Sequence, residues 1–130
     1  MAKQGEIIKN YDKSPEMGEV DYVVEWQKPT EKNGYTWYRL YASGWIEMGG
    51  EMKNPNSSGT AIITVNFPKE MNDTHYTCLL GSRYDGNDAD KYGQTRQSWT
   101  TSSFTVYMTS PAYGANYQYG WWIVRGIVKI

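Results

Sequence analysis

Three segments of the chain alternate apolar and polar side chains with a period of two. The apolar positions are Ala61, Ile63, Val65 and Phe67 in 60–67, Tyr76, Cys78 and Leu80 in 74–81, and Phe104, Val106 and Met108 in 104–109. Successive side chains of a strand point to opposite faces, so this pattern is typical of strands with one buried face. We therefore predict a strand in each segment.

A hairpin is predicted around Ala42-Ser43-Gly44, because strand-forming runs at 35–41 and 45–48 flank this short turn. Gly49-Gly50 is expected to close the hairpin, and the turn-forming residues of 51–59 predict a loop. The β-branched and aromatic run at 22–27 predicts a further short strand, and the polar segment 94–101 predicts an edge strand.

The last segment, 119–130, alternates two apolar sets. Trp122, Val124 and Val128 form the better inward set, because the opposite face carries Arg125, which cannot easily face a dry core. These segments predict an all-β fold, an antiparallel β-sandwich of about six to eight short strands over 22–130. Residues 1–21 are charged and interrupted by Pro15 and Gly18, so we expect an extended N-terminal arm.

Composition narrows the class of function. The chain of 130 residues contains 12 Tyr and 6 Trp, and its formal net charge is −1. Its basic residues are scattered, so no nucleic acid is expected as a partner. The apolar stretches are far shorter than a membrane span, so no membrane insertion is expected.

Few residues are available for catalysis or metal binding. His75, expected in the strand at 74–81, is the only histidine, and Cys78 is the only cysteine. These counts exclude an internal disulfide and disfavour a metal site or a catalytic triad, so we expect no cofactor, no metal and no enzyme activity. Asp85, Asp88 and Asp90 offer an alternative as Ca²⁺ ligands, but their spacing does not match an EF-hand, and a solvated loop is favoured.

Aromatic and polar side chains occur together in two segments predicted as loops. The candidate receptor-binding residues are Tyr113, Asn116, Tyr117 and Tyr119 in one segment, and Tyr84, Asp85, Asn87 and Asp88 in the long loop expected over 82–93. Aromatic rings stack on apolar faces of sugars, while amides and carboxylates bind hydroxyl groups. The alternative is that these tyrosines pack between subunits or onto the sandwich.

The hairpin also resembles a known family. WYRLYASGWIEMGG, followed by ITVNFPKEMNDTHYTCLLGS, SFTVYM and the terminal GWWIVRGIV, is similar to the C-terminal domain of phage and prophage tail-fibre proteins. Met48 stands where glutamine is common in that family. The resemblance implies a small sandwich similar to the H-type lectin fold, assembled as a trimer at a fibre tip and engaged in host recognition.

The expected function follows from this resemblance. The chain is expected to be a virion protein, made in the host cytoplasm, whose loops contact a glycan or protein of the bacterial surface. The alternative is a structural virion component, such as a head fibre, decoration protein or tail adaptor, attached to other virion proteins through residues 1–21. A homo-oligomer, with a trimer as the expected form, is also predicted because Trp37-Tyr38 and Trp121-Trp122 are adjacent pairs that point to opposite faces.

Overall fold

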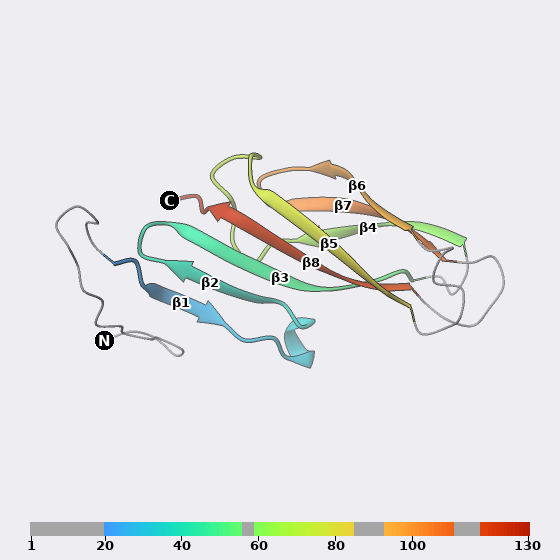
Figure 1. Cartoon of the computed structure of the whole chain (residues 1–130), viewed down its shortest axis with the longest axis horizontal. Coiled ribbons are helices and arrows are strands. Elements are labelled where there is room, and N and C mark those ends of the chain that lie inside the picture. Colours follow the sequence, from blue (N-terminus) through green and yellow to red (C-terminus); the bar gives the residue numbers. More distant parts are fainter. Residues whose placement is uncertain (1–19, 56–58, 85–92, 111–117) are drawn as a thin grey trace.

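A computed structural model describes residues 20–55, 59–84, 93–110 and 118–130, which form two antiparallel sheets (Figure 1). The larger sheet has the order β1-β2-β3-β8-β5. Its strands are β1 (Val23–Gln27), β2 (Trp37–Tyr41), β3 (Trp45–Lys53), β8 (Gln118–Ile127) and β5 (Thr77–Tyr84). The smaller sheet consists of β4 (Gly59–Asn66), β7 (Ser103–Ser110) and β6 (Gly93–Trp99), in that order. The predicted β-sandwich is confirmed.

The predicted alternation of side chains also holds. In β4, Val65 is buried, whereas Ile62, which points to the opposite face of the same strand, is 59% exposed. Trp122 and Val124 are buried, while Arg125 between the inward positions is exposed. The inward set was correct because an unpaired guanidinium is far more costly to bury than an apolar ring.

Aromatic rings join the two sheets in the core. Phe104 of β7 and Phe67, just after β4, each lie 5.8 Å from the ring of Trp122, measured between centroids. The Phe67 ring is stacked on the indole, and the Phe104 ring meets it edge-on. Rings packed in these geometries add stabilisation beyond the area that they bury.

The predicted end of the hairpin is wrong, because β3 continues through Gly49-Gly50 to Lys53. These glycines make room for indoles instead of forming a turn. A Cβ atom on Gly49 would lie 2.7 Å from Cζ2 of Trp37, and one on Gly50 would lie 2.9 Å from Nε1 of Trp122. The two positions face opposite sides of β3, so one glycine serves each face of the sheet.

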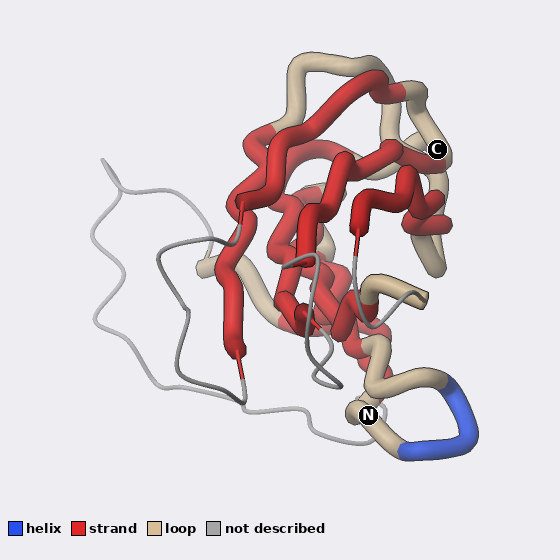
Figure 2. The backbone as a smooth tube through the Cα atoms, turned by 90° about the vertical axis from the view of Figure 1, so that its right-hand side faces the viewer, coloured by secondary structure: helices blue, strands red, loops and turns tan. Residues whose placement is uncertain are grey.

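Other boundaries differ from the predictions. β5 begins at Thr77 and not at residue 74, because the backbone N–H of His75 donates to Oδ1 of Asp73 at 2.8 Å in a local turn. β5 also extends to Tyr84, where a loop was predicted, since β8 supplies pairing partners back to Gln118. Figure 2 shows a short 3-10 turn, η2 (Glu31–Asn33), that protrudes from the strands.

The sandwich has two different ends. We call the first the loop end, since β3, β5 and β7 finish there, at Lys53, Tyr84 and Ser110. We call the opposite side the turn end, where the hairpin turn 42–44 lies (Figure 1). At the turn end the N–H of Ala42 donates to the carbonyl of Tyr22 at 2.8 Å, and that of Val128 donates to Gly44 at 2.9 Å. The first and last described residues therefore both lie at the turn end.

Candidate functional site

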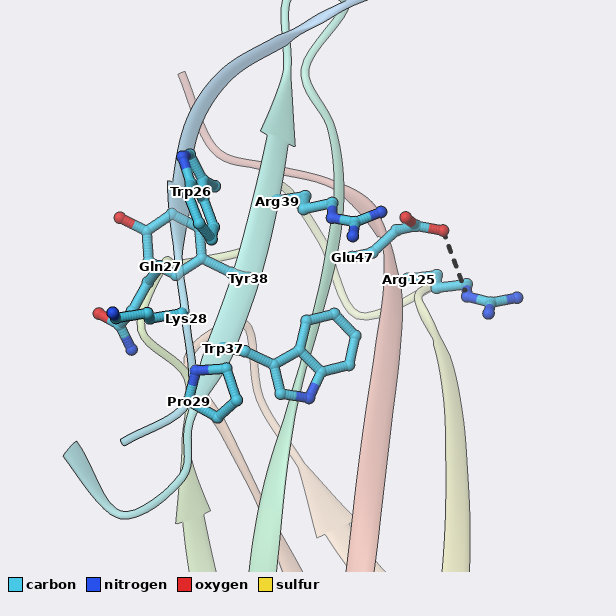
Figure 3. A pocket seen from close by; sticks show the side chains of 9 residues that line it. All are labelled: Trp26, Gln27, Lys28, Pro29, Trp37, Tyr38, Arg39, Glu47 and Arg125. Carbon is cyan, nitrogen blue, oxygen red and sulfur yellow. Dashed lines mark ion pairs between the residues drawn. The ribbon is translucent and has the colours of Figure 1, made fainter. Parts of the chain in front are cut away.

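A groove of about 480 Å³ lies on the outer face of the larger sheet (Figure 3). Its walls come from β1, the segment after it, β2, β3 and β8, and the lining residues are Trp26, Gln27, Lys28, Pro29, Trp37, Tyr38, Arg39, Glu47 and Arg125. Its volume is in the range of small-molecule sites, roughly 300–1,000 Å³. We take this groove as the candidate functional site.

Strand register brings the polar residues of the groove together. Trp26 pairs with Arg39, Arg39 with Glu47, and Glu47 with Arg125, so these four residues form one row across β1, β2, β3 and β8. Cross-strand neighbours on one face lie about 4.5–5.5 Å apart at Cβ, which places their side chains within reach of one another. The row therefore crosses most of the sheet as a continuous polar and aromatic strip.

Trp37 provides an aromatic surface beside this row. Its indole lies against the backbone of β3 at Gly49, and in Figure 3 the ring is seen broad side on. Trp26, by contrast, is seen edge-on at the other side of the groove. The two indoles thus offer one flat face and one upright wall to the space between them.

The charges of the groove are not balanced. Lys28, Arg39 and Arg125 contribute three cations to the lining, against the single carboxylate of Glu47. Glu47 Oε2 lies 3.6 Å from Nε of Arg125, and Glu47 Oε1 accepts a hydrogen bond from the hydroxyl of Tyr41 at 3.4 Å. Within the described ranges, the side chain of Arg39 has no hydrogen bond or ion pair. The Arg39 guanidinium is therefore available to an anionic ligand.

Hydrogen bonds hold the rim of the groove after β1. The side-chain amide of Gln27 donates to the carbonyl of Thr36 at 2.7 Å, and that of Asn33 donates to the carbonyl of Lys28 at 2.9 Å. Thr30 and Asn33 form a capping box at η2. These contacts fix the segment that carries Lys28 and Pro29.

A second polar cluster lies on the inner side of β1 and β2. The hydroxyl of Tyr38 donates to Oε2 of Glu25, and Nζ of Lys69 lies 2.7 Å from the same oxygen. Burial, together with the hydrogen bond to Glu25 and its charge, raises the pKa of Tyr38 to about 12. Because this phenol stays protonated at neutral pH, the cluster serves to hold β1, β2 and the segment before β5 together.

The structure places only part of the predicted receptor-binding residues. Tyr113, Asn116, Tyr117, Asp85, Asn87 and Asp88 lie outside the described residues. Tyr119 is half-buried on β8, with Nζ of Lys53 at 5.6 Å from its ring centroid. Tyr84 is the last residue of β5, and its backbone pairs with Gln118 next to Tyr119. The described members of the two candidate segments therefore lie on neighbouring strands at the loop end.

The sequence analysis missed the groove residues. A signal was present, since Trp37 and Arg39 are two residues apart in a strand and must share a face. Their proximity to Glu47 and Arg125 depends on the register between strands, which local alternation does not reveal.

Within the described ranges, no three His, Cys, Asp or Glu residues are grouped so that they could hold a metal ion. His75 is exposed in the segment before β5, not in a strand as predicted, and Cys78 is half-buried on β5. No helix within those ranges is long and apolar enough to cross a membrane.

No known family model and no curated protein matches the sequence. Among solved structures, the chain is similar to an N-truncated R1-type pyocin tail fibre, with a TM-score of 0.46 and 16% identity over 69% of this chain and 77% of that chain. It is also similar to a C-terminal part of the P. aeruginosa R1 pyocin fibre, of which 25% is covered at 16% identity and a TM-score of 0.46. An N-truncated R2-type pyocin tail fibre matches at 18% identity and a TM-score of 0.41, over 70% of this chain and 34% of that chain. All three of these structures are pyocin tail fibres.

Proposed function

We propose that this chain is a phage virion protein with a tail-fibre-like receptor-binding domain, which contacts a glycan or protein of the bacterial host surface. One observation carries the proposal: the described chain begins at the turn end, whereas β3, β5 and β7 finish at the loop end. A domain attached at one end presents its opposite end outward, and loops on a rigid sandwich are common places for binding residues. In this proposal the domain binds without catalysis.

The proposed domain works as a homotrimer whose subunits meet on the β8–β5 side of the larger sheet. Leu79 is 51% exposed there and pairs with Ile123, while Trp121 on the same face is 40% exposed. Contiguous exposed apolar side chains of this kind mark contact surfaces. The groove, on the β1–β2 side of the same face, remains open in such an assembly.

Replacement of one outward leucine tests the proposed contact. We expect sedimentation to give a trimer for the parent chain and smaller species for Leu79→Glu, because a carboxylate is costly to bury in an apolar contact. Ile62→Glu is the matched control, since Ile62 is 59% exposed on the outward face of the smaller sheet. A parent chain that stays monomeric at micromolar concentration would refute the trimer.

Deletion of residues 1–21 tests whether the domain is attached to the particle at its turn end and presents its loop end to the host. We expect the shortened protein to be lost from particles while the isolated trimer still binds host cells. Loss from particles without the arm, together with no host binding by the parent, would favour a structural virion component such as a head fibre, decoration protein or tail adaptor, and incorporation without the arm would refute attachment through residues 1–21. Tyr84→Ala and Tyr117→Ala then test the loop residues, and unchanged binding by folded variants would exclude them from the contact.

A further inference from the structure

We infer that the groove between Trp26 and Trp37 binds an acidic saccharide, a pyranose that carries a carboxylate. The inference rests on the proposed function and deepens it, because it names the chemistry of one receptor group and adds a contact on the sheet face to the contact proposed at the loop end.

The first argument is the shape and the aromatic surface of the groove. The Trp37 indole lies flat on β3, where the absence of a side chain on Gly49 lets it approach the backbone. Its outward face is the kind of surface on which the apolar face of a sugar ring stacks. Trp26 and Pro29 border this surface, and the hollow of about 480 Å³ is large enough for a small oligosaccharide (Figure 3).

The second argument is charge. Glu47 interacts with Arg125 and with the Tyr41 hydroxyl and forms no ion pair with Arg39, so the groove keeps an excess of positive charge. The planar guanidinium of arginine matches a carboxylate with two parallel N–H donors. A neutral sugar would leave this geometry unused, whereas a uronic or sialic acid would engage it beside the stacking face.

The third argument is the set of hydrogen bonds that hold the rim of the groove. Gln27 and Asn33 hold the rim through the hydrogen bonds to Thr36 and Lys28, and η2 is closed by its capping box. A rim that the protein's own hydrogen bonds hold in place loses less conformational freedom on binding, which favours affinity for a small ligand.

Titration of the whole trimer by calorimetry tests the inference. The probes are trigalacturonic acid and sialyllactose, each compared with a neutral counterpart, the fully methyl-esterified trigalacturonate and lactose. We expect at least one acid to bind about tenfold or more tightly than its counterpart, which is the effect of about one charge-assisted hydrogen bond. No binding of either acid at millimolar concentration, or equal binding of acid and neutral form, would overturn the inference.

Matched variants assign the effect to the groove. Arg39→Gln should weaken binding of the acid by about tenfold and leave the neutral sugar unaffected, because only the charge-assisted hydrogen bonds are lost. Lys129→Gln removes the same charge at the turn end, where Lys129 lies near Glu70, and should change nothing. A hexaglutamate peptide that binds as tightly as the sugar acid would show that charge alone is recognised, and would also overturn the inference.

Adsorption to host cells separates this inference from the proposed function. If the parent adsorbs and Arg39→Gln adsorbs equally well, the groove inference fails while receptor binding stands. If the parent binds the acidic saccharide but does not adsorb to cells, the proposed function fails and the saccharide site remains.

Discussion

Gly49→Ala should destabilise the domain, because the added methyl group meets both neighbouring strands. Its Cβ would lie 2.6 Å from the carbonyl oxygen of Trp122 and 2.7 Å from Cζ2 of Trp37. The indole lies on the outer face and can shift. The Trp122 oxygen cannot, because it belongs to the backbone of β8, and β8 pairs with the whole length of β3. Overpacking of this kind costs about 1–3 kcal/mol, and we expect a loss in the upper half of that range.

The free energy of unfolding, measured in urea by tryptophan fluorescence at one fixed protein concentration, checks this value. Gly81→Ala on β5 is the control, since no atom lies within 4 Å of its added Cβ. The free energy of unfolding of Gly81→Ala should stay within about 1 kcal/mol of the parent value, because alanine also reduces the entropy of the unfolded chain. Gly126→Ala should fall between the two, since its closest neighbour is the flexible end of Met71. Equal stabilities for the Gly49 and Gly81 variants would refute the steric explanation.

Three further results are expected. Trp122→Ala should cost about 3–5 kcal/mol of unfolding free energy, because the indole is buried; Trp99→Ala, at a position 46% exposed, should cost about 1 kcal/mol or less in the same urea titration. The pKa of Tyr38 is raised from 10.0 to about 12 in the folded chain. The protonated hydroxyl therefore stabilises the fold fully below pH 10, and this contribution is lost as the pH rises through about 12. Relative to Tyr38→Phe, the parent should therefore lose about 2–3 kcal/mol more over that interval, and parallel slopes in unfolding experiments at stepped pH would contradict this. EDTA should leave the melting temperature unchanged; a clear fall would identify the aspartate-rich stretch 85–90 as a Ca²⁺ site.

Local alternation was sufficient to predict most of the sandwich. The inward sets of β4, β7 and β8 were predicted correctly because burial of one strand face imposes a period of two on the sequence. The last strand has two alternating apolar sets, and the charge of Arg125 identifies the face that must point outward. The edge position of β6 also followed from its polar composition and is confirmed by the strand order.

Glycine was the residue type that misled the sequence analysis. The sequence predicts that Gly49-Gly50 closes the hairpin, because glycine often ends a strand, yet both residues lie within β3. Their role depends on Trp37 and Trp122, which come from two other strands. A close approach between distant segments leaves no local pattern, so it could not be distinguished from a turn in advance.

The candidate site was decided by tertiary structure alone. The sequence contains Trp26, Arg39, Glu47 and Arg125 as separate residues, and only the register of β1, β2, β3 and β8 aligns them in one row. A shift of one residue in any pairing would move a member of this row to the other face of the sheet. Periodicity determines which face of a strand is buried, whereas non-local strand pairing determines which outward side chains meet.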